Sequence, residues 1–154
     1  MMRLPAASVA LISGISAPLY TQWVQKRILT AARYGDCTER QAFEAAVAAV
    51  LKPHIKSLAL LRTAVGQARP RLQRIGNKIP RTLDLVWVPK RRLAIWVQGS
   101  TQLAEAVRVS TFVVVLPMSE TLAEVREAFS QEVAGRMPSA ESILRIVRPI
   151  MGNR

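Results

Sequence analysis

The chain has few of the residues on which enzymes and metal sites depend. Its 154 residues include one cysteine, Cys37, and one histidine, His54. A single thiol excludes an internal disulfide and any zinc or iron–sulfur site that needs several cysteines from one chain. One histidine and one cysteine do not suffice for a Ser/His/Asp or Cys/His constellation. We therefore expect a protein that is not an enzyme and that binds no cofactor and no metal.

Familiar nucleotide- and RNA-binding motifs are also missing. The sequence has neither the aromatic sheet motif of an RRM nor a Gly-x-x-Gly loop of the KH type. Gly76-Asn77-Lys78 lacks the spacing of a P-loop and its following serine or threonine. The glutamates of residues 120–132 lie opposite an apolar face, which predicts a solvated helix surface and no acid–base pair. Any nucleic acid should therefore be recognised through shape and phosphates more than through sequence.

Acidic residues are nearly absent from the middle of the chain. Between Lys52 and Arg92 there are eleven basic residues and one acid, Asp84, so this segment carries +10 of the net charge of +12. Arginines outnumber lysines seventeen to five, and a guanidinium group pairs bidentately with phosphate and stacks on bases. This concentration of charge predicts contact with a polyanion, and it favours RNA over an anionic membrane surface.

Helix-breaking residues divide the basic segment into a connection and a hairpin tip. Pro70, Gly76 and Pro80 predict an irregular basic connection over residues 69–81. Residues 89–92 are a proline and three cations between two predicted strands, so they should form the tip of a β-hairpin. We expect the connection to follow a phosphate backbone and the tip to enter a groove. The predicted RNA-binding residues are Arg69, Arg71, Arg74, Lys78, Arg81, Lys90, Arg91 and Arg92.

Charge is also missing from the N-terminal segment. No charged residue occurs from Leu4 to Gln25, and no acid precedes Asp36. A mitochondrial presequence fits this composition best, whereas a secretory signal fits loosely and a membrane span over residues 4–25 is weakened by its polar residues. We expect residues 1–18 to be an apolar arm or an uncleaved targeting-like segment, and the protein to be mitochondrial, in the matrix or at the matrix face of the inner membrane.

Helical periodicity dominates the first half of the chain. It predicts a helix over residues 19–33, ended by Gly35, and a second helix that begins at a capping box formed by Thr38 and Gln41. Pro53 should interrupt this second helix before the pattern resumes at Ile55.

The second half changes to strand periodicity. Strands are predicted at 83–88, 93–97 and 112–116, with a helix over 99–109 and further helices from Ser119 and Ser139. A right-handed crossover would place the third strand parallel to the second. The predicted class is α+β, a single domain over residues 19–154 with N-terminal helices, a small three-stranded mixed sheet (a β-hairpin plus a β-α-β crossover) and two C-terminal helices. Trp87 and Trp96 should be core residues, with a base-stacking platform as the alternative.

Two functional hypotheses follow. The first is a non-catalytic structural subunit of a large organellar assembly, a mitochondrial ribosomal protein that contacts rRNA, or another polyanion, through residues 52–92 and neighbouring subunits through its apolar helices. The alternative is an accessory subunit of a mitochondrial inner-membrane respiratory or ATP synthase complex. In that case residues 4–25 would contact the membrane and the basic segment would face anionic lipid.

Overall fold

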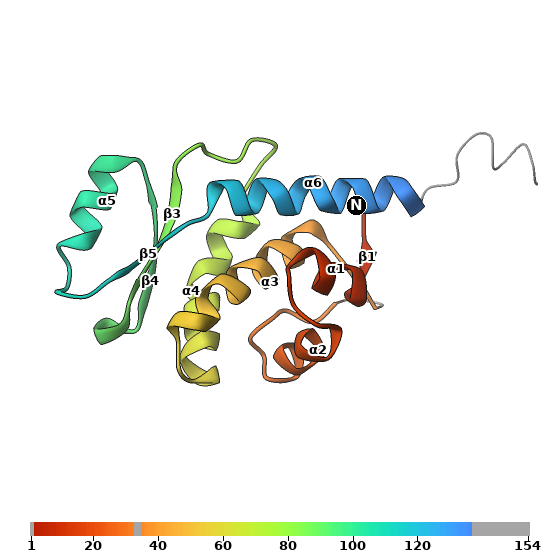
Figure 1. Ribbon diagram of the computed structural model, residues 1–154, viewed down its shortest axis with the longest axis horizontal. Coiled ribbons are helices and arrows are strands. Elements are labelled where there is room, and N and C mark those ends of the chain that lie inside the picture. Colours follow the sequence, from red (N-terminus) through yellow and green to blue (C-terminus); the bar gives the residue numbers. More distant parts are fainter. Residues whose placement is uncertain (1, 33–34, 137–154) are drawn as a thin grey trace, which may run out of the picture.

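The computed structural model describes residues 2–32 and 35–136, which form six α-helices and two small antiparallel sheets (Figure 1). The predicted α+β class is confirmed. The three-stranded sheet lies between α5 on one side and the other helices, α1 to α4 and α6, on the other (Figure 1). We call these five helices the helical part of the molecule. The elements are β1 Leu4–Pro5, α1 Ala6–Ile12, α2 Ala17–Gln25, β2 Asp36–Cys37, α3 Glu39–Leu51, α4 Leu58–Gln73, β3 Leu83–Val88, β4 Leu93–Gln98, α5 Ser100–Val107, β5 Val114–Pro117 and α6 Ser119–Arg136, with 3₁₀ turns at Lys52–His54 and Pro89–Arg91.

The N-terminal residues, expected as an arm, contribute to the core. Leu4 pairs with Cys37 in the two-stranded sheet of β1 and β2. Leu4 and Val9 are fully buried, and α1 packs against α2, α3 and α6. Few side chains of this segment are large, which is why a core element was not expected, but Leu4, Val9 and Ala10 are enclosed and Ile12 and Ile15 pack against the core. Within residues 2–32 and 35–136, no helix is both long and apolar enough to cross a membrane.

The helix predicted over residues 19–33 is shorter, because α2 ends at Gln25. The Ile28 N–H donates to the Trp23 carbonyl at 2.9 Å and the Arg27 N–H donates to Val24 at 3.0 Å. This pair of bonds is a Schellman motif, with Arg27 in the left-handed region at φ 60° where glycine is usual. The turn buries the side chains of Ile28 and Leu29 against the core. A continued helix would have directed these two side chains elsewhere.

Two local predictions about the next helices are confirmed. Thr38 and Gln41 form the capping box that begins α3, with bonds between each side chain and the backbone N–H of the other. The helix ends at Leu51, and Pro53 lies in the 3₁₀ turn that follows. By contrast, α4 continues through Pro70 to Gln73.

The three-stranded sheet has the order β4-β3-β5, and both of its ladders are antiparallel. The hairpin of β3 and β4 is confirmed, but the prediction of a mixed sheet is wrong. The third strand does run in the same direction as β4, yet it pairs with β3. On the outer edge of β4, the Gln67 and Gln102 side chains bind the N–H groups of Ala94 and Gln98, and β5 pairs with the other edge of β3.

The last strand is shorter and more exposed than predicted. Strand β5 begins at Val114, and Phe112, expected inside a buried strand, is 66% exposed. After it, the Ser119 hydroxyl donates to the Pro80 carbonyl and accepts the Leu83 N–H, both at 2.7 Å, which fixes the start of α6 beside the start of β3. The predicted helix from Ser139 lies outside the described residues.

Candidate nucleic-acid interface

The basic segment contains almost no ion pairs. Residues 2–32 and 35–136 form three salt bridges, and of the eleven basic residues from 52 to 92 only Arg69 takes part in one. The cations elsewhere that pair are Arg126, which contacts Glu39 at 3.0 Å and lies over the Phe43 ring, and Arg136, which contacts Glu132 at 3.3 Å. Arg69 is therefore the one cation of the basic segment that has a carboxylate partner among the described residues.

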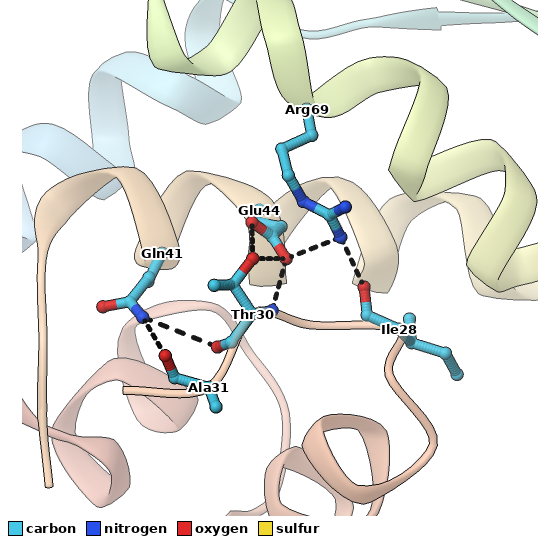
Figure 2. A network of polar contacts seen from close by, with 6 residues as sticks. All are labelled: Ile28, Thr30, Ala31, Gln41, Glu44 and Arg69. Carbon is cyan, nitrogen blue, oxygen red and sulfur yellow. Dashed lines mark hydrogen bonds and ion pairs between the residues drawn. The ribbon is translucent and has the colours of Figure 1, made fainter. Parts of the chain in front are cut away.

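Arg69 belongs to a structural network (Figure 2). Its guanidinium contacts Glu44 at 3.1 Å and the Ile28 carbonyl at 3.2 Å. The same carboxylate accepts the Thr30 N–H at 2.6 Å and the Thr30 hydroxyl. The Glu44 side chain is 6% exposed. These bonds join α3, α4 and the turn after α2, so the Arg69 guanidinium is engaged in contacts within the domain, although 29% of its side chain is exposed.

Helical geometry separates Arg69 from Arg71. The two lie two residues apart in α4, and two residues correspond to about 200° around a helix. Arg69 points to the flank of α4 that faces Glu44, whereas Arg71 points to the flank that faces β4. The Arg71 guanidinium donates to the Gln98 side chain at 3.1 Å. The predicted basic connection is therefore divided at its start between a structural cation and one that borders the sheet.

The hairpin tip is attached to α4 by a glutamine. The Gln67 side chain accepts the Ala94 N–H at 2.6 Å and donates to the Arg92 carbonyl at 3.1 Å, so it substitutes for a neighbouring strand at this end of β4. Lys90, Arg91 and Arg92 are all exposed. Arg92 has φ 51°, in the left-handed region. This attachment holds the three cations of the tip in place beside α4.

The remaining predicted cations lie beyond the C-terminal end of α4. Arg74, Lys78 and Arg81 are exposed, in or next to the loop that joins α4 to β3. Figure 1 shows this loop and the hairpin turn at opposite ends of β3. Six strand residues correspond to about 20 Å. We call the seven cations other than Arg69 the basic edge: Arg71, Arg74, Lys78, Arg81, Lys90, Arg91 and Arg92.

A groove lies between α4 and β4 in the middle of the basic edge. Its volume is about 380 Å³, and we call it the α4–β4 groove. The side chains that matter for its chemistry are Gln67, Arg71, Arg74, Trp96, Gln98 and Gln102. Two of these are cations and three are amides, and no acid lines the groove. Such a lining suits an anionic ligand with hydrogen-bonding groups.

The tryptophans are core residues, as expected. Trp87 is 1% exposed and lies in the main core. Trp96 is half-buried, and its indole N–H donates to the Ala68 carbonyl of α4 at 3.0 Å. That bond holds the Trp96 ring against α4, so the two residues do not form an open stacking platform. The residues that sequence reasoning missed are the amides Gln67, Gln98 and Gln102, because a glutamine carries no spacing signal of its own.

The ionisable groups of the helical part include a buried pair away from the basic edge. The Tyr20 hydroxyl lies 3.3 Å from the Cys37 sulfur. Burial raises the pKa of Tyr20 far above its usual range, and the hydrogen bond to Cys37 adds to this effect. Burial also raises the pKa of Cys37, although the bond to Tyr20 acts in the opposite direction. The described ranges contain no group of three or more His, Cys, Asp or Glu side chains that could hold a metal ion.

Neither protein-family models nor curated proteins give a match to this chain.

Proposed function

We propose that this protein is a non-catalytic RNA-binding subunit of a larger assembly and that the basic edge is its RNA-contact surface. The observation that carries the proposal is the absence of ion pairs: within the part of the chain described, no residue of the basic edge has a carboxylate within salt-bridge distance. Uncompensated cations that lie close together repel one another and destabilise the compact state. A polyanion removes this cost, and it gains entropy because counterions are released.

The arrangement of the basic edge supports a long ligand. The cations extend along β4 from the hairpin tip to the loop before β3, a span of about 20 Å. Double-stranded nucleic acid carries one charge per roughly 1.7 Å of axis, so several phosphates would face this span. Contact would be largely independent of base sequence at the tip and the loop, where the exposed cations would contact phosphates. The mitochondrial ribosome is the assembly that we propose for such a subunit.

The proposal is tested by RNA binding as a function of salt. Fluorescence anisotropy with two RNAs of unrelated sequence should give similar affinities. Five to seven phosphate contacts imply a slope of log K against log salt between about −4 and −6. A triple variant of the hairpin tip, with Lys90, Arg91 and Arg92 changed to Ala, should lower affinity and flatten the slope. Its melting temperature should match that of the parent protein, because exposed substitutions usually change stability by less than about 0.5 kcal/mol.

The control removes the same charge from the helical part. A variant with Arg3, Arg27 and Arg40 changed to Ala loses three exposed cations that lie outside the basic edge. It should retain most of the RNA affinity. Equal losses in both triple variants would mean that only net charge matters. Binding to vesicles that contain cardiolipin, without salt-sensitive binding to RNA, would overturn the proposal in favour of a membrane-complex subunit.

A further inference from the structure

The α4–β4 groove differs from the rest of the basic edge because it offers hydrogen-bonding groups as well as charge. The Gln98 N–H donates to the Gln102 side chain at 2.8 Å, and the Gln98 side-chain oxygen accepts from Arg71. The side-chain oxygens of Gln98 and Gln102 therefore each accept a hydrogen bond. In the described residues, the side-chain NH₂ groups of Gln98 and Gln102 have no partner. The groove therefore combines two guanidinium groups with two amide donors.

The edge of β4 leaves one more position open in the groove. Outward-pointing N–H groups alternate along an edge strand. The N–H of Ala94 is bound by Gln67 and that of Gln98 by Gln102, so the N–H and C=O of Trp96, midway between them, also point outward. Within the described residues, no hydrogen bond involves these two backbone groups of Trp96. An adjacent donor and acceptor therefore lie at the centre of the groove.

We propose that the α4–β4 groove binds one unpaired nucleotide of the RNA, with its phosphate on Arg71 and Arg74 and its base against the β4 edge. This inference rests on the proposed function and adds a ligand class to it. Base edges are available to protein donors and acceptors only where RNA is single-stranded, in loops, bulges and ends. In a duplex the groove could reach phosphates alone. The groove thus selects an unpaired strand, whereas the hairpin tip accepts either form.

The helix supplies a matched control for the two arginines. Arg62 and Arg71 are nine residues apart in α4, which corresponds to about 180° around the helix. Arg62 is exposed on the flank that faces away from β4. A change of Arg62 to Ala removes a cation from the same helix without touching the groove. The exposed Arg74, which makes no side-chain hydrogen bond within the described residues, provides a single variant that is expected to fold normally if the double variant does not.

The first experiment compares variants by anisotropy with a single-stranded RNA and with a duplex. Hydrogen bonds to charged groups are strong enough that loss of the pair R71A/R74A should weaken single-strand binding at least about tenfold. The salt slope should fall by about 1.4, or 0.7 for each single-strand phosphate. R62A should change affinity less than about twofold, and R74A alone should lie between R62A and the double variant. Duplex binding should fall less than single-strand binding in R71A/R74A.

The second experiment locates the ligand with the three tryptophan indole signals in an NMR titration with single-stranded RNA. Trp96 lines the groove, whereas Trp23 and Trp87 are each 1% exposed. A shift of the Trp96 signal alone, assigned with Trp96→Phe, supports the proposal. An unchanged Trp96 signal, or equal losses in R71A/R74A and R62A, would overturn it while leaving the proposed function intact. If R71A/R74A loses as much affinity for the duplex as for the single strand, the proposal that the bound nucleotide is unpaired is overturned. If the parent protein shows no salt-sensitive RNA binding, the proposed function itself fails.

Discussion

The helical part of the molecule and the basic edge treat charge in opposite ways. In the helical part, Glu44 and Arg69 are paired and hydrogen-bonded to the backbone, and Glu39 is paired with Arg126. Along the basic edge, seven cations from the last turn and cap of α4, the loop after it and the hairpin turn have no carboxylate partner among the described residues. The same residue type, arginine, stabilises the fold in the first region and is available to a ligand in the second. Both the pairing with an acid and the place in the fold separate these roles, because Arg3, Arg27 and Arg40 of the helical part are also exposed and form no salt bridge within the described residues.

The largest expected effect comes from removing the N-terminal elements. Deletion of residues 2–12 removes β1 and α1, together with the fully buried side chains of Leu4 and Val9. We expect the deleted protein to lose its cooperative unfolding transition in circular dichroism. The single change Leu4→Ala should lower the free energy of unfolding by about 2–5 kcal/mol. A truncated protein that melts like the parent would contradict a role of residues 2–12 in the core and would support the expectation of an arm.

Removing the central acid of the helical part should have the next largest effect. Glu44→Ala leaves Arg69 and the Thr30 N–H without their acceptor. We expect a loss of about 2–3 kcal/mol, less than the roughly 3–5 kcal/mol of a fully buried pair, because the Arg69 side chain is 29% exposed. Urea unfolding measures this as a lower midpoint at unchanged slope. RNA affinity at a temperature where the variant is folded should stay close to that of the parent.

Alkaline pH should weaken the helical part and leave the arginines of the basic edge charged. The raised pKa values of Tyr20 and Cys37 mean that their contribution to stability is complete below the ordinary pKa of each group. It is lost as pH rises above about 8.5 for the thiol and about 10 for the phenol, by up to roughly 1.4 kcal/mol per pH unit for each group. Urea midpoints between pH 7 and 10.5 test this. In Cys37→Ala the decline should begin at higher pH.

The smallest expected effects distinguish two arginines with the same backbone strain. Arg27 and Arg92 both have positive φ, at 60° and 51°. Replacement of either by Gly should relieve strain and raise stability by up to about 1 kcal/mol. Only Arg92→Gly should weaken RNA binding, because Arg27 lies in the helical part. Melting temperatures and anisotropy measure both quantities on the same samples, and an equal loss of affinity in the two variants would contradict the division into two regions.

The sequence was informative wherever a structure depends on near neighbours. The capping box of Thr38 and Gln41, the interruption at Pro53 and the β-hairpin each arise within a few residues, and each is confirmed. The end of α2 was not predictable from the helical period, because it depends on the burial of Ile28 and Leu29 against distant elements. Pro70 likewise does not end α4, since Ala68 and Leu72 on either side of it are buried in the core.

Long-range contacts explain the other differences. Strand β5 pairs with β3 and not with β4, and this pairing depends on contacts at the β4 edge. There, Gln67 from α4 and Gln102 from α5 accept hydrogen bonds from the β4 backbone. For the candidate site, the concentration of cations was evident from the sequence. The structural role of Arg69 was not evident from the sequence. Its partner Glu44 lies 25 residues away, and only the packing of α3 against α4 brings the two side chains together.

A comparison of Arg69→Ala with Arg74→Ala tests most directly whether paired and unpaired cations of the basic segment have different roles. Each removes one cation, and the two positions are five residues apart on the same helix and its cap. Arg69→Ala should lower the free energy of unfolding by about 2–3 kcal/mol, because the buried Glu44 carboxylate loses its counter-charge, and it should change RNA affinity less than about twofold. Arg74→Ala should leave stability within about 0.5 kcal/mol and clearly weaken RNA binding. If Arg69→Ala weakens RNA binding as much as Arg74→Ala does, the distinction between paired and unpaired cations is contradicted.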